Sequence, residues 1–155
     1  MVTLWLLWLP FCIKKGKNGM NTQDFRKFKD KKALVDWLIE TKRIEKRTEA
    51  LKWMKKYIPL EGKFQSAILD YLNKQPGFFA FKLHSGSYMK GGLPDVWAVK
   101  DGKLYAFEVK RPFELGEPTE LQLKQIKRLR EAGAMAEVVT YVAEVAQLIG
   151  GSYGE

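Results

Sequence analysis

The spacing of hydrophobic residues first predicts helices. Residues 30–43 and 45–57 place apolar side chains at helical spacing among lysines and arginines. Residues 61–73 keep a period near 3.6, and Pro76 and Gly77 then end the pattern. We therefore expect two short basic helices followed by a helix that packs against the core.

The pattern then changes to one typical of strands. Segments 78–84, 95–100 and 103–110 are rich in aromatic and β-branched residues, and each predicts a strand. Asp101 and Gly102 separate the last two segments, and Asp-Gly between strand-like runs is a strong hairpin signal. An antiparallel meander is the expected result.

A helix and a strand follow the meander. Thr119 and Gln122 have the spacing of a capping box, which predicts a helix that runs to about Ala132 and stops at Gly133. Residues 136–142 predict a last strand, with a short helix after it. A crossover helix implies a parallel pair, so the fold class is α/β with a mixed four-stranded sheet in α-β-β-β-α-β order.

The predicted hairpin brings charged residues together. A turn at Asp101-Gly102 places Asp95 opposite Glu108, and Glu108 and Lys110 share one face of their strand. Two opposed carboxylates repel each other unless a divalent cation neutralises them. Oxygen ligands favour Mg²⁺, for which Mn²⁺ can substitute, and Lys110 can orient an attacking water. With Glu61 arriving from a helix edge, this arrangement suits phosphodiester hydrolysis.

Charge is distributed unevenly along the 155 residues. Residues 14–56 hold 15 Lys and Arg against 6 Asp and Glu, and they carry the whole net charge of +9. Such a block attracts phosphate backbones, so nucleic acid is the expected partner, although a solvated helical face is the alternative reading.

The lone cysteine, Cys12, excludes an internal disulfide and fits a cytoplasmic protein. The apolar residues 1–13 are too short to span a membrane as a helix, and we interpret them as an extension upstream of a start at Met20, with an anchor at the membrane surface as the alternative.

Several motifs resemble those of known nucleases. Pro94-Asp95 followed by Glu108-Val109-Lys110 resembles the PD-(D/E)XK signature. The Glu61-x-x-x-Gln65 helix, Gly91-Gly92 before Pro94-Asp95, and Thr119-x-x-Gln122 are similar to the VRR-NUC family in its stand-alone, phage-like form. The resemblance divides the chain into an extension (1–19), a basic helical segment (20–57) and a VRR-NUC-like domain (58–150).

The resemblance also implies roles for individual residues. It implies that Asp95, Glu108 and the backbone carbonyl of Val109 bind the metal, with Glu61 as a further candidate ligand. It makes Lys110 the catalytic lysine and Gln122 an active-site support. Gln122 can equally be a capping residue only. The further candidates for phosphate contacts are Lys82, His84 and Lys90.

The expected function is a divalent-metal-dependent endonuclease acting on branched, flap or junction DNA. A Holliday-junction resolvase is the nearest alternative, and it requires a homodimer that places two active sites on opposing strands. A DNA-binding module without catalytic activity is the alternative from another class.

Overall fold

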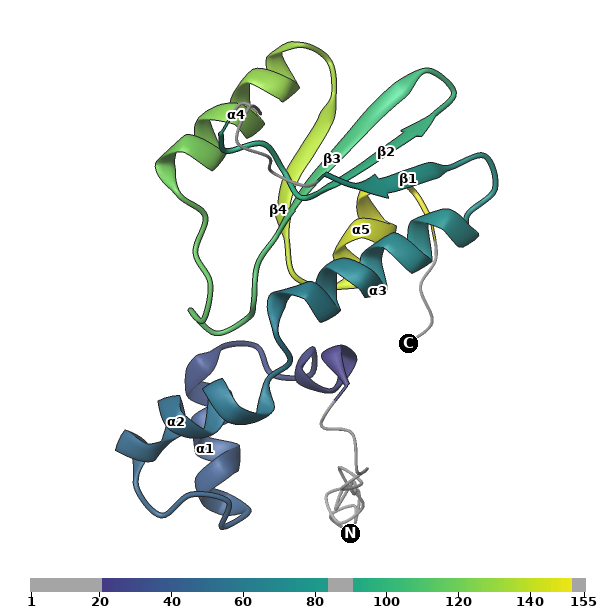
Figure 1. The fold of residues 1–155 in the computed structure, drawn as a ribbon. Coiled ribbons are helices and arrows are strands. Elements are labelled where there is room, and N and C mark those ends of the chain that lie inside the picture. Colours follow the sequence, from purple (N-terminus) through teal and green to yellow (C-terminus); the bar gives the residue numbers. More distant parts are fainter. Residues whose placement is uncertain (1–20, 84–90, 152–155) are drawn as a thin grey trace, which may run out of the picture.

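The computed structural model describes residues 21–83 and 91–151, and its centre is a four-stranded sheet (Figure 1). The strands lie in the order β1-β2-β3-β4; the first three form an antiparallel meander, and β4 runs parallel to β3. The strands are β1 Phe79–Lys82, β2 Val96–Lys100, β3 Lys103–Val109 and β4 Met135–Val139. The predicted mixed sheet is confirmed.

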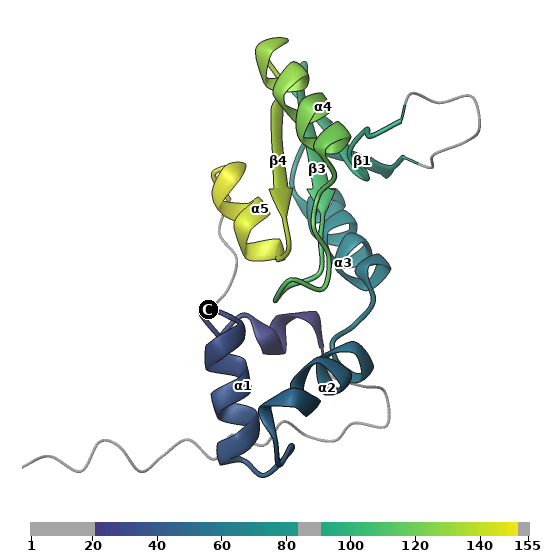
Figure 2. The same ribbon diagram turned by 90° about the vertical axis from the view of Figure 1, so that its left-hand side faces the viewer.

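Helices cover both faces of the sheet (Figures 1 and 2). On one face, α3 (Glu61–Lys74) and α5 (Val142–Leu148) bury the larger core, to which β3 contributes Phe107 and Val109. On the other face, α4 (Glu120–Glu131) covers a smaller cluster of Ala106, Ile126 and Ala136. Because side chains alternate along β3, Glu108 and Lys110 share one face, as the sequence predicted, and this is the face that α4 covers.

Local chemistry fixes the hairpin and α4. Asp101 and Gly102 both have positive φ angles, 49° and 74°, which suit a two-residue hairpin turn. Val96 pairs with Phe107 in the next step of the ladder, so the predicted register is correct. Helix α4 has the predicted capping box at Thr119 and ends just before Gly133, whose φ is 91°.

The N-terminal helices are shorter than the sequence predicted. They are η1 (Thr22–Phe25), α1 (Lys31–Glu40), η2 (Arg47–Glu49) and α2 (Ala50–Tyr57). The predicted helix over 45–57 therefore begins as a 3-10 turn. Its first residues stay outside the helix because the carboxylate of Glu49 accepts hydrogen bonds from their N–H groups. The last strand also stops early, since α5 starts at Val142.

The N-terminal helices pack against the rest of the molecule through a continuous apolar cluster that includes Phe25, Leu38, Met54 and Phe64. Phe25 meets the ring of Phe113 edge-on, with centroids 6.4 Å apart.

The proposed division of the chain at residue 58 stays a prediction. In the described ranges no helix is long and apolar enough to cross a membrane. The predicted extension over residues 1–19 lies outside these ranges.

Candidate active site

The carboxylate of Glu108 is the centre of a cluster of polar side chains on the α4 face. Glu108 is fully buried, with 0% of its surface exposed. Its Oε1 lies 2.5 Å from Lys110 Nζ and accepts a hydrogen bond of 2.5 Å from Gln122 Nε2. Its Oε2 is also buried, and within the described residues no donor reaches this atom. One oxygen is thus held by two donors, and the other is left without a partner.

Asp95 stands beside Glu108 in the position that the hairpin register predicted. It directly precedes β2, and its carbonyl accepts a 2.8 Å hydrogen bond from Leu83 N–H, so β1 anchors its backbone. Its carboxylate Oδ2 accepts a 3.3 Å hydrogen bond from Val109 N–H on β3. Two carboxylates therefore meet at neighbouring strands, with the backbone of Val109 between them.

Glu61 joins the cluster from the start of α3. Its Oε2 lies 3.9 Å from Lys110 Nζ, and its side chain is 34% exposed. Helix α3 buries Phe64, Ile68 and Leu72 in the core, which fixes the direction of its first turn. Lys110 thus lies between the carboxylates of Glu61 and Glu108.

The charges in the cluster shift the ionisation of its members. Burial, together with the negative charges of Asp95 and Glu61, raises the pKa of Glu108 to about 7, against the opposing effect of Lys110. Burial is the largest single effect on Lys110 and lowers its pKa, but the hydrogen bond to Glu108 and the negative charges of Glu108, Glu61 and Asp95 together outweigh it, so the pKa is raised overall. Lys110 therefore stays protonated while Glu108 is held in an environment that disfavours its negative charge.

A divalent cation would relieve this unfavourable environment. Asp95 and Glu108 offer two carboxylates, and Glu108 Oε2 is a buried acceptor without a donor in the described part of the chain. The backbone carbonyl of Val109 is a further candidate oxygen donor. The β2–β3 ladder ends at Val96 and Phe107; continued by two residues, its register would bring Pro94 opposite Val109, and proline has no N–H with which to occupy the carbonyl of Val109. These oxygen donors suit Mg²⁺ or Mn²⁺.

Glu61 does not complete a three-carboxylate group. In the described segments, no set of three or more Asp, Glu, His or Cys side chains is close enough to hold a metal. Glu61 instead approaches Lys110, and any contact with a metal through water remains a prediction.

Gln122 makes the contacts that each of the two roles left open by the sequence requires. Its Oε1 accepts a 2.8 Å hydrogen bond from Thr119 N–H, and its N–H donates to Thr119 Oγ1 at 3.2 Å. Its Nε2 meanwhile donates to Glu108. The capping box therefore fixes the amide orientation that supports the buried carboxylate.

Two residues that support the site were missed by the sequence analysis. Arg111 donates hydrogen bonds to the carbonyls of Pro59 and Ile58, at 2.9 and 2.7 Å, and so holds the segment that leads into Glu61. A Cβ on Gly116 would lie 3.2 Å from Arg111 N and 3.4 Å from Glu61 Oε2. The adjacency of Arg111 to Lys110 is visible in the sequence, but the partners of Arg111, Ile58 and Pro59, are distant along the chain.

The candidate phosphate contacts are not part of this cluster. Lys82 is exposed and pairs with Val96 across β1 and β2, so its side chain starts on the face opposite to Asp95. His84 and Lys90 lie outside the described residues. Their roles stay predictions.

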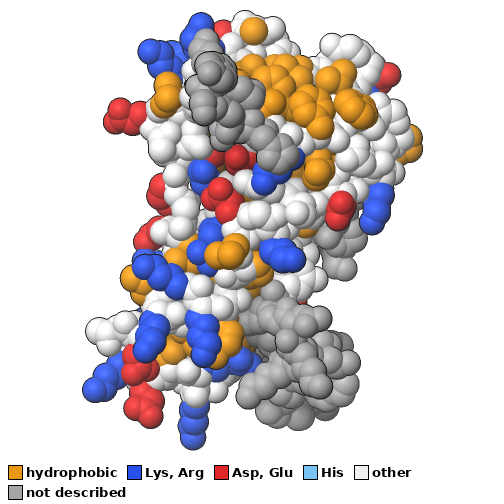
Figure 3. All heavy atoms as spheres, viewed as in Figure 1, with side chains coloured by type: hydrophobic (Ala, Val, Ile, Leu, Met, Phe, Trp, Pro, Cys, Tyr) orange, Lys and Arg blue, Asp and Glu red, His pale blue; other side chains and the backbone are white. Residues whose placement is uncertain are grey.

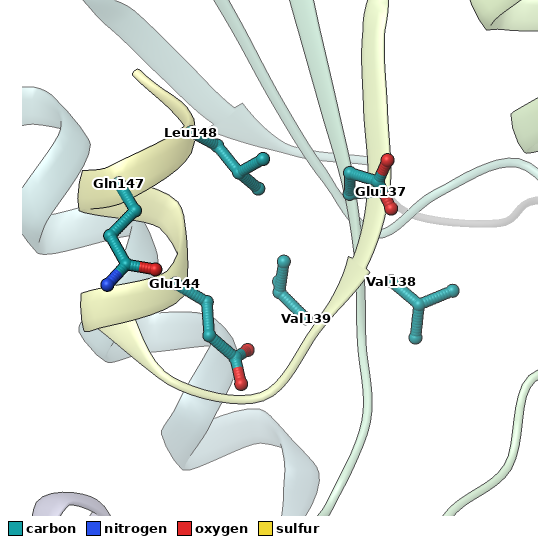
Figure 4. A pocket seen from close by; sticks show the side chains of 6 residues that line it. All are labelled: Glu137, Val138, Val139, Glu144, Gln147 and Leu148. Atoms are coloured by element: carbon teal, nitrogen blue, oxygen red, sulfur yellow. The ribbon is translucent and has the colours of Figure 1, made fainter. Parts of the chain in front are cut away.

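A pocket of about 290 Å³ lies elsewhere, between β4 and α5 (Figure 4). Its two acids are already engaged. Glu137 pairs with Arg130, and Glu144 accepts hydrogen bonds from the N–H groups of Thr140 and Tyr141. The other lining residues are Val138, Val139, Gln147 and Leu148. This pocket offers no group for catalysis, so the cluster around Glu108 is the candidate site.

Comparison with known proteins gives matches among solved structures only. No family model matches the chain, and no curated protein does. The chain is similar to a VRR_NUC domain with 29% identity, covering 60% of this chain and 97% of that domain, with a TM-score of 0.49. A VRR_NUC domain protein matches with 19% identity, coverage of 58% and 84%, and a TM-score of 0.45. Hjc, a Holliday junction resolvase of Archaeoglobus fulgidus, matches with 27% identity, coverage of 52% and 67%, and a TM-score of 0.42.

Proposed function

We propose that this protein is a divalent-metal-dependent endonuclease that hydrolyses phosphodiester bonds of DNA. The observation that carries the proposal is the buried Glu108 carboxylate, which is held at one oxygen by Lys110 and Gln122 and lies beside Asp95. A buried carboxylate beside a second, partly exposed carboxylate and a fixed lysine suits catalysis and would be costly as a purely structural feature.

Each residue has a distinct part in the proposed reaction. Asp95, Glu108 and the carbonyl of Val109 would hold Mg²⁺ or Mn²⁺, which when bound polarises a phosphate oxygen and lowers the pKa of water. Lys110, protonated between Glu61 and Glu108, orients a nucleophilic water and stabilises the negative charge that develops on the phosphate. Gln122 keeps Glu108 in place, and Glu61 keeps Lys110 directed toward the site.

The proposed substrate is branched DNA, such as a flap or junction. The basic N-terminal helices support a nucleic-acid partner, because they carry the excess of positive charge. Selectivity among DNA structures rests on the VRR-NUC resemblance and needs a direct test.

The test is cleavage of labelled single strand, duplex, flap and four-way junction DNA with Mg²⁺, Mn²⁺ or EDTA. Wild type is compared with Lys110→Ala and with Lys103→Ala, an exposed lysine on the same strand. Metal-dependent cutting that Lys110→Ala loses and Lys103→Ala retains is the expected result. Equal activity in Lys110→Ala would refute the assigned site.

A Holliday-junction resolvase is a second candidate, and the open edge of the sheet favours it. Phe79 and Val99 are 68% and 39% exposed, and they lie on the α4 face of the sheet, on the outer strands that α4 does not cover. In the described ranges no strand pairs with the outer side of β1. An exposed apolar edge favours association of two copies. A dimeric mass in solution and paired nicks in a four-way junction would support this candidate, whereas a monomer that cuts flaps would exclude it.

A binding module without catalytic activity makes a different prediction. Such a module would bind DNA equally well with and without metal, would keep its affinity in Asp95→Ala, and would cut none of the four substrates. DNA binding together with no cleavage under any metal condition would therefore replace the nuclease proposal.

A further inference from the structure

Helix α2 presents a lysine-rich surface that the proposed chemistry does not use. Its buried side, with Ala50, Trp53 and Met54, packs into the core and fixes the rotation of the helix. Lys52, Lys55 and Lys56 are exposed on the remaining side, and α2 contains no acidic residue. These three side chains are called the lysine face below.

The charge of the lysine face is not neutralised by ion pairs in the described residues. Two other cations of the N-terminal helices are paired: Arg47 with Asp36 at 2.5 Å, and Lys31 with Glu114 at 2.6 Å. The carboxylate of Glu49, just before α2, accepts hydrogen bonds from backbone N–H groups. The lysine face therefore projects positive potential into solvent.

The lysine face is held at a fixed position relative to the candidate active site. Helix α2 ends at Tyr57, and only Ile58, Pro59 and Leu60 separate it from Glu61. Arg111 clamps this connection to the end of β3 through hydrogen bonds to two of its carbonyls. Because Lys110 precedes Arg111, the same stretch of backbone positions both the catalytic lysine and the end of α2.

Helix α2 and the start of α3, which carries Glu61, lie next to each other in the chain and are seen from one side in Figure 1. On the same side, Figure 3 shows basic side chains over α2, with some acidic side chains beside them, and further acidic side chains above, near the start of α3. A polyanion that reaches the acidic cluster can thus extend over α2.

The lysine face suits the sugar-phosphate backbone better than the bases. Lysines act as point charges on phosphates and carry no base specificity. The tryptophan of α2, Trp53, is 9% exposed and packs with Tyr57, so it offers no free surface for base stacking. Duplex DNA has the higher density of phosphate charge, which favours it over a single strand.

We propose that the lysine face binds the phosphate backbone of a duplex arm of the substrate and thereby positions the scissile phosphate at Glu108 and Lys110. The second part of this proposal, the positioning of the scissile phosphate, rests on the proposed nuclease function. The binding half is independent of catalysis, because it requires only that duplex DNA contact Lys52, Lys55 and Lys56.

The test compares two triple variants of the full chain. The first is Lys52→Gln/Lys55→Gln/Lys56→Gln. The control, Lys32→Gln/Lys74→Gln/Lys103→Gln, removes the same number of charges from exposed lysines on α1, the end of α3 and the start of β3. Binding to a labelled duplex is measured in EDTA, as a function of salt, so that no cleavage occurs.

We expect the lysine-face variant to reduce the slope of log affinity against log salt by about 2.7, and the control by less than about 1. Between 50 and 200 mM salt, wild type would then lose about 40-fold more affinity than the variant. Cleavage of a duplex-containing substrate below saturation should fall together with the affinity in the lysine-face variant and stay within twofold of wild type in the control. Equal slope changes in both variants would overturn the proposal.

Two further outcomes separate the possible failures. Weakened binding of single strands with unchanged duplex binding would overturn the assignment to a duplex arm. If wild type cuts no DNA but the slope difference persists, the nuclease proposal fails and the binding surface stands. Circular dichroism of both variants verifies the fold, which exposed lysines should not disturb.

Discussion

Gln122 Nε2 donates a 2.5 Å hydrogen bond to Glu108 Oε1, while the amide oxygen of the same side chain caps α4. The two bonds use opposite ends of one amide, so the start of α4 determines how the buried carboxylate is held. This relationship connects the stability of α4 to the candidate active site. It can be tested with one variant that removes the amide donor to Glu108 and another that weakens the helix cap.

Gln122→Glu should preserve the acceptor for the cap but place a second carboxylate against Glu108. We expect the metal-dependent cleavage rate, or the Mg²⁺ affinity measured by calorimetry, to fall about 10- to 100-fold, as for other residues that support metal ligands. Thr119→Ala is the control. It should cost about 1 kcal/mol of stability through the lost cap and leave Mg²⁺ affinity unchanged. If Gln122→Glu and Thr119→Ala lowered the Mg²⁺ affinity equally, loss of the helix cap alone would explain the effect.

Lys110→Gln should reduce single-turnover cleavage about 10²- to 10³-fold, because it removes the cation that stabilises developing charge. The neutral side chain can still donate to Glu108 Oε1, so the fold should persist. Glu61→Gln removes the negative charge of the more distant partner of Lys110, at 3.9 Å, and should reduce the cleavage rate less than Lys110→Gln does. The ranking would be wrong if Glu61→Gln were the more damaging change.

The metal-free protein should lose stability as the pH rises. Burial raises the pKa of Glu108 to about 7 from 4.5, so the native state binds this proton more tightly than the unfolded state does. The stabilisation is complete below about pH 4.5 and is lost as the pH rises through about 7, to a total of at most about 3 kcal/mol. Thermal unfolding in EDTA from pH 5 to 8 should show this decline in wild type.

Glu108→Gln is the control for that experiment, because it cannot ionise. Its melting temperature should depend less on pH than that of wild type, and excess Mg²⁺ should flatten the wild-type decline by neutralising the carboxylate. If the melting temperatures of wild type and Glu108→Gln changed with pH in parallel, groups other than Glu108 would dominate the pH dependence.

Gly92→Ala should destabilise the protein by about 1–3 kcal/mol, measured by urea unfolding. Gly92 has a φ of 77°, and an added Cβ would lie 2.6 Å from Leu121 Cγ and 3.0 Å from its carbonyl carbon. The change would force α4 away from the segment that leads to Asp95. Gly62→Ala is the matched control, since nothing lies within 4 Å of its added Cβ and α3 is helical there. It should stabilise by about 0.5–1 kcal/mol.

The sequence by itself determined the sheet and the register that pairs the two carboxylates. Asp101-Gly102 permits only a tight turn between two strand-like runs, and from there the alternation of side chains places Asp95 against Glu108. The Thr119 capping box likewise fixed the start of α4. These are local relationships, so a short stretch of chain contains all the information that they need.

Only the tertiary structure decided what holds those carboxylates. The bond from Gln122 to Glu108, the full burial of Glu108 and the clamp of Arg111 on Ile58 and Pro59 each join separate elements. Such contacts depend on how helices pack on the two faces of the sheet, which periodicity does not specify. The N-terminal helices were misjudged for a related reason: the Glu49 cap and packing onto the core, rather than helical spacing, set where α2 begins.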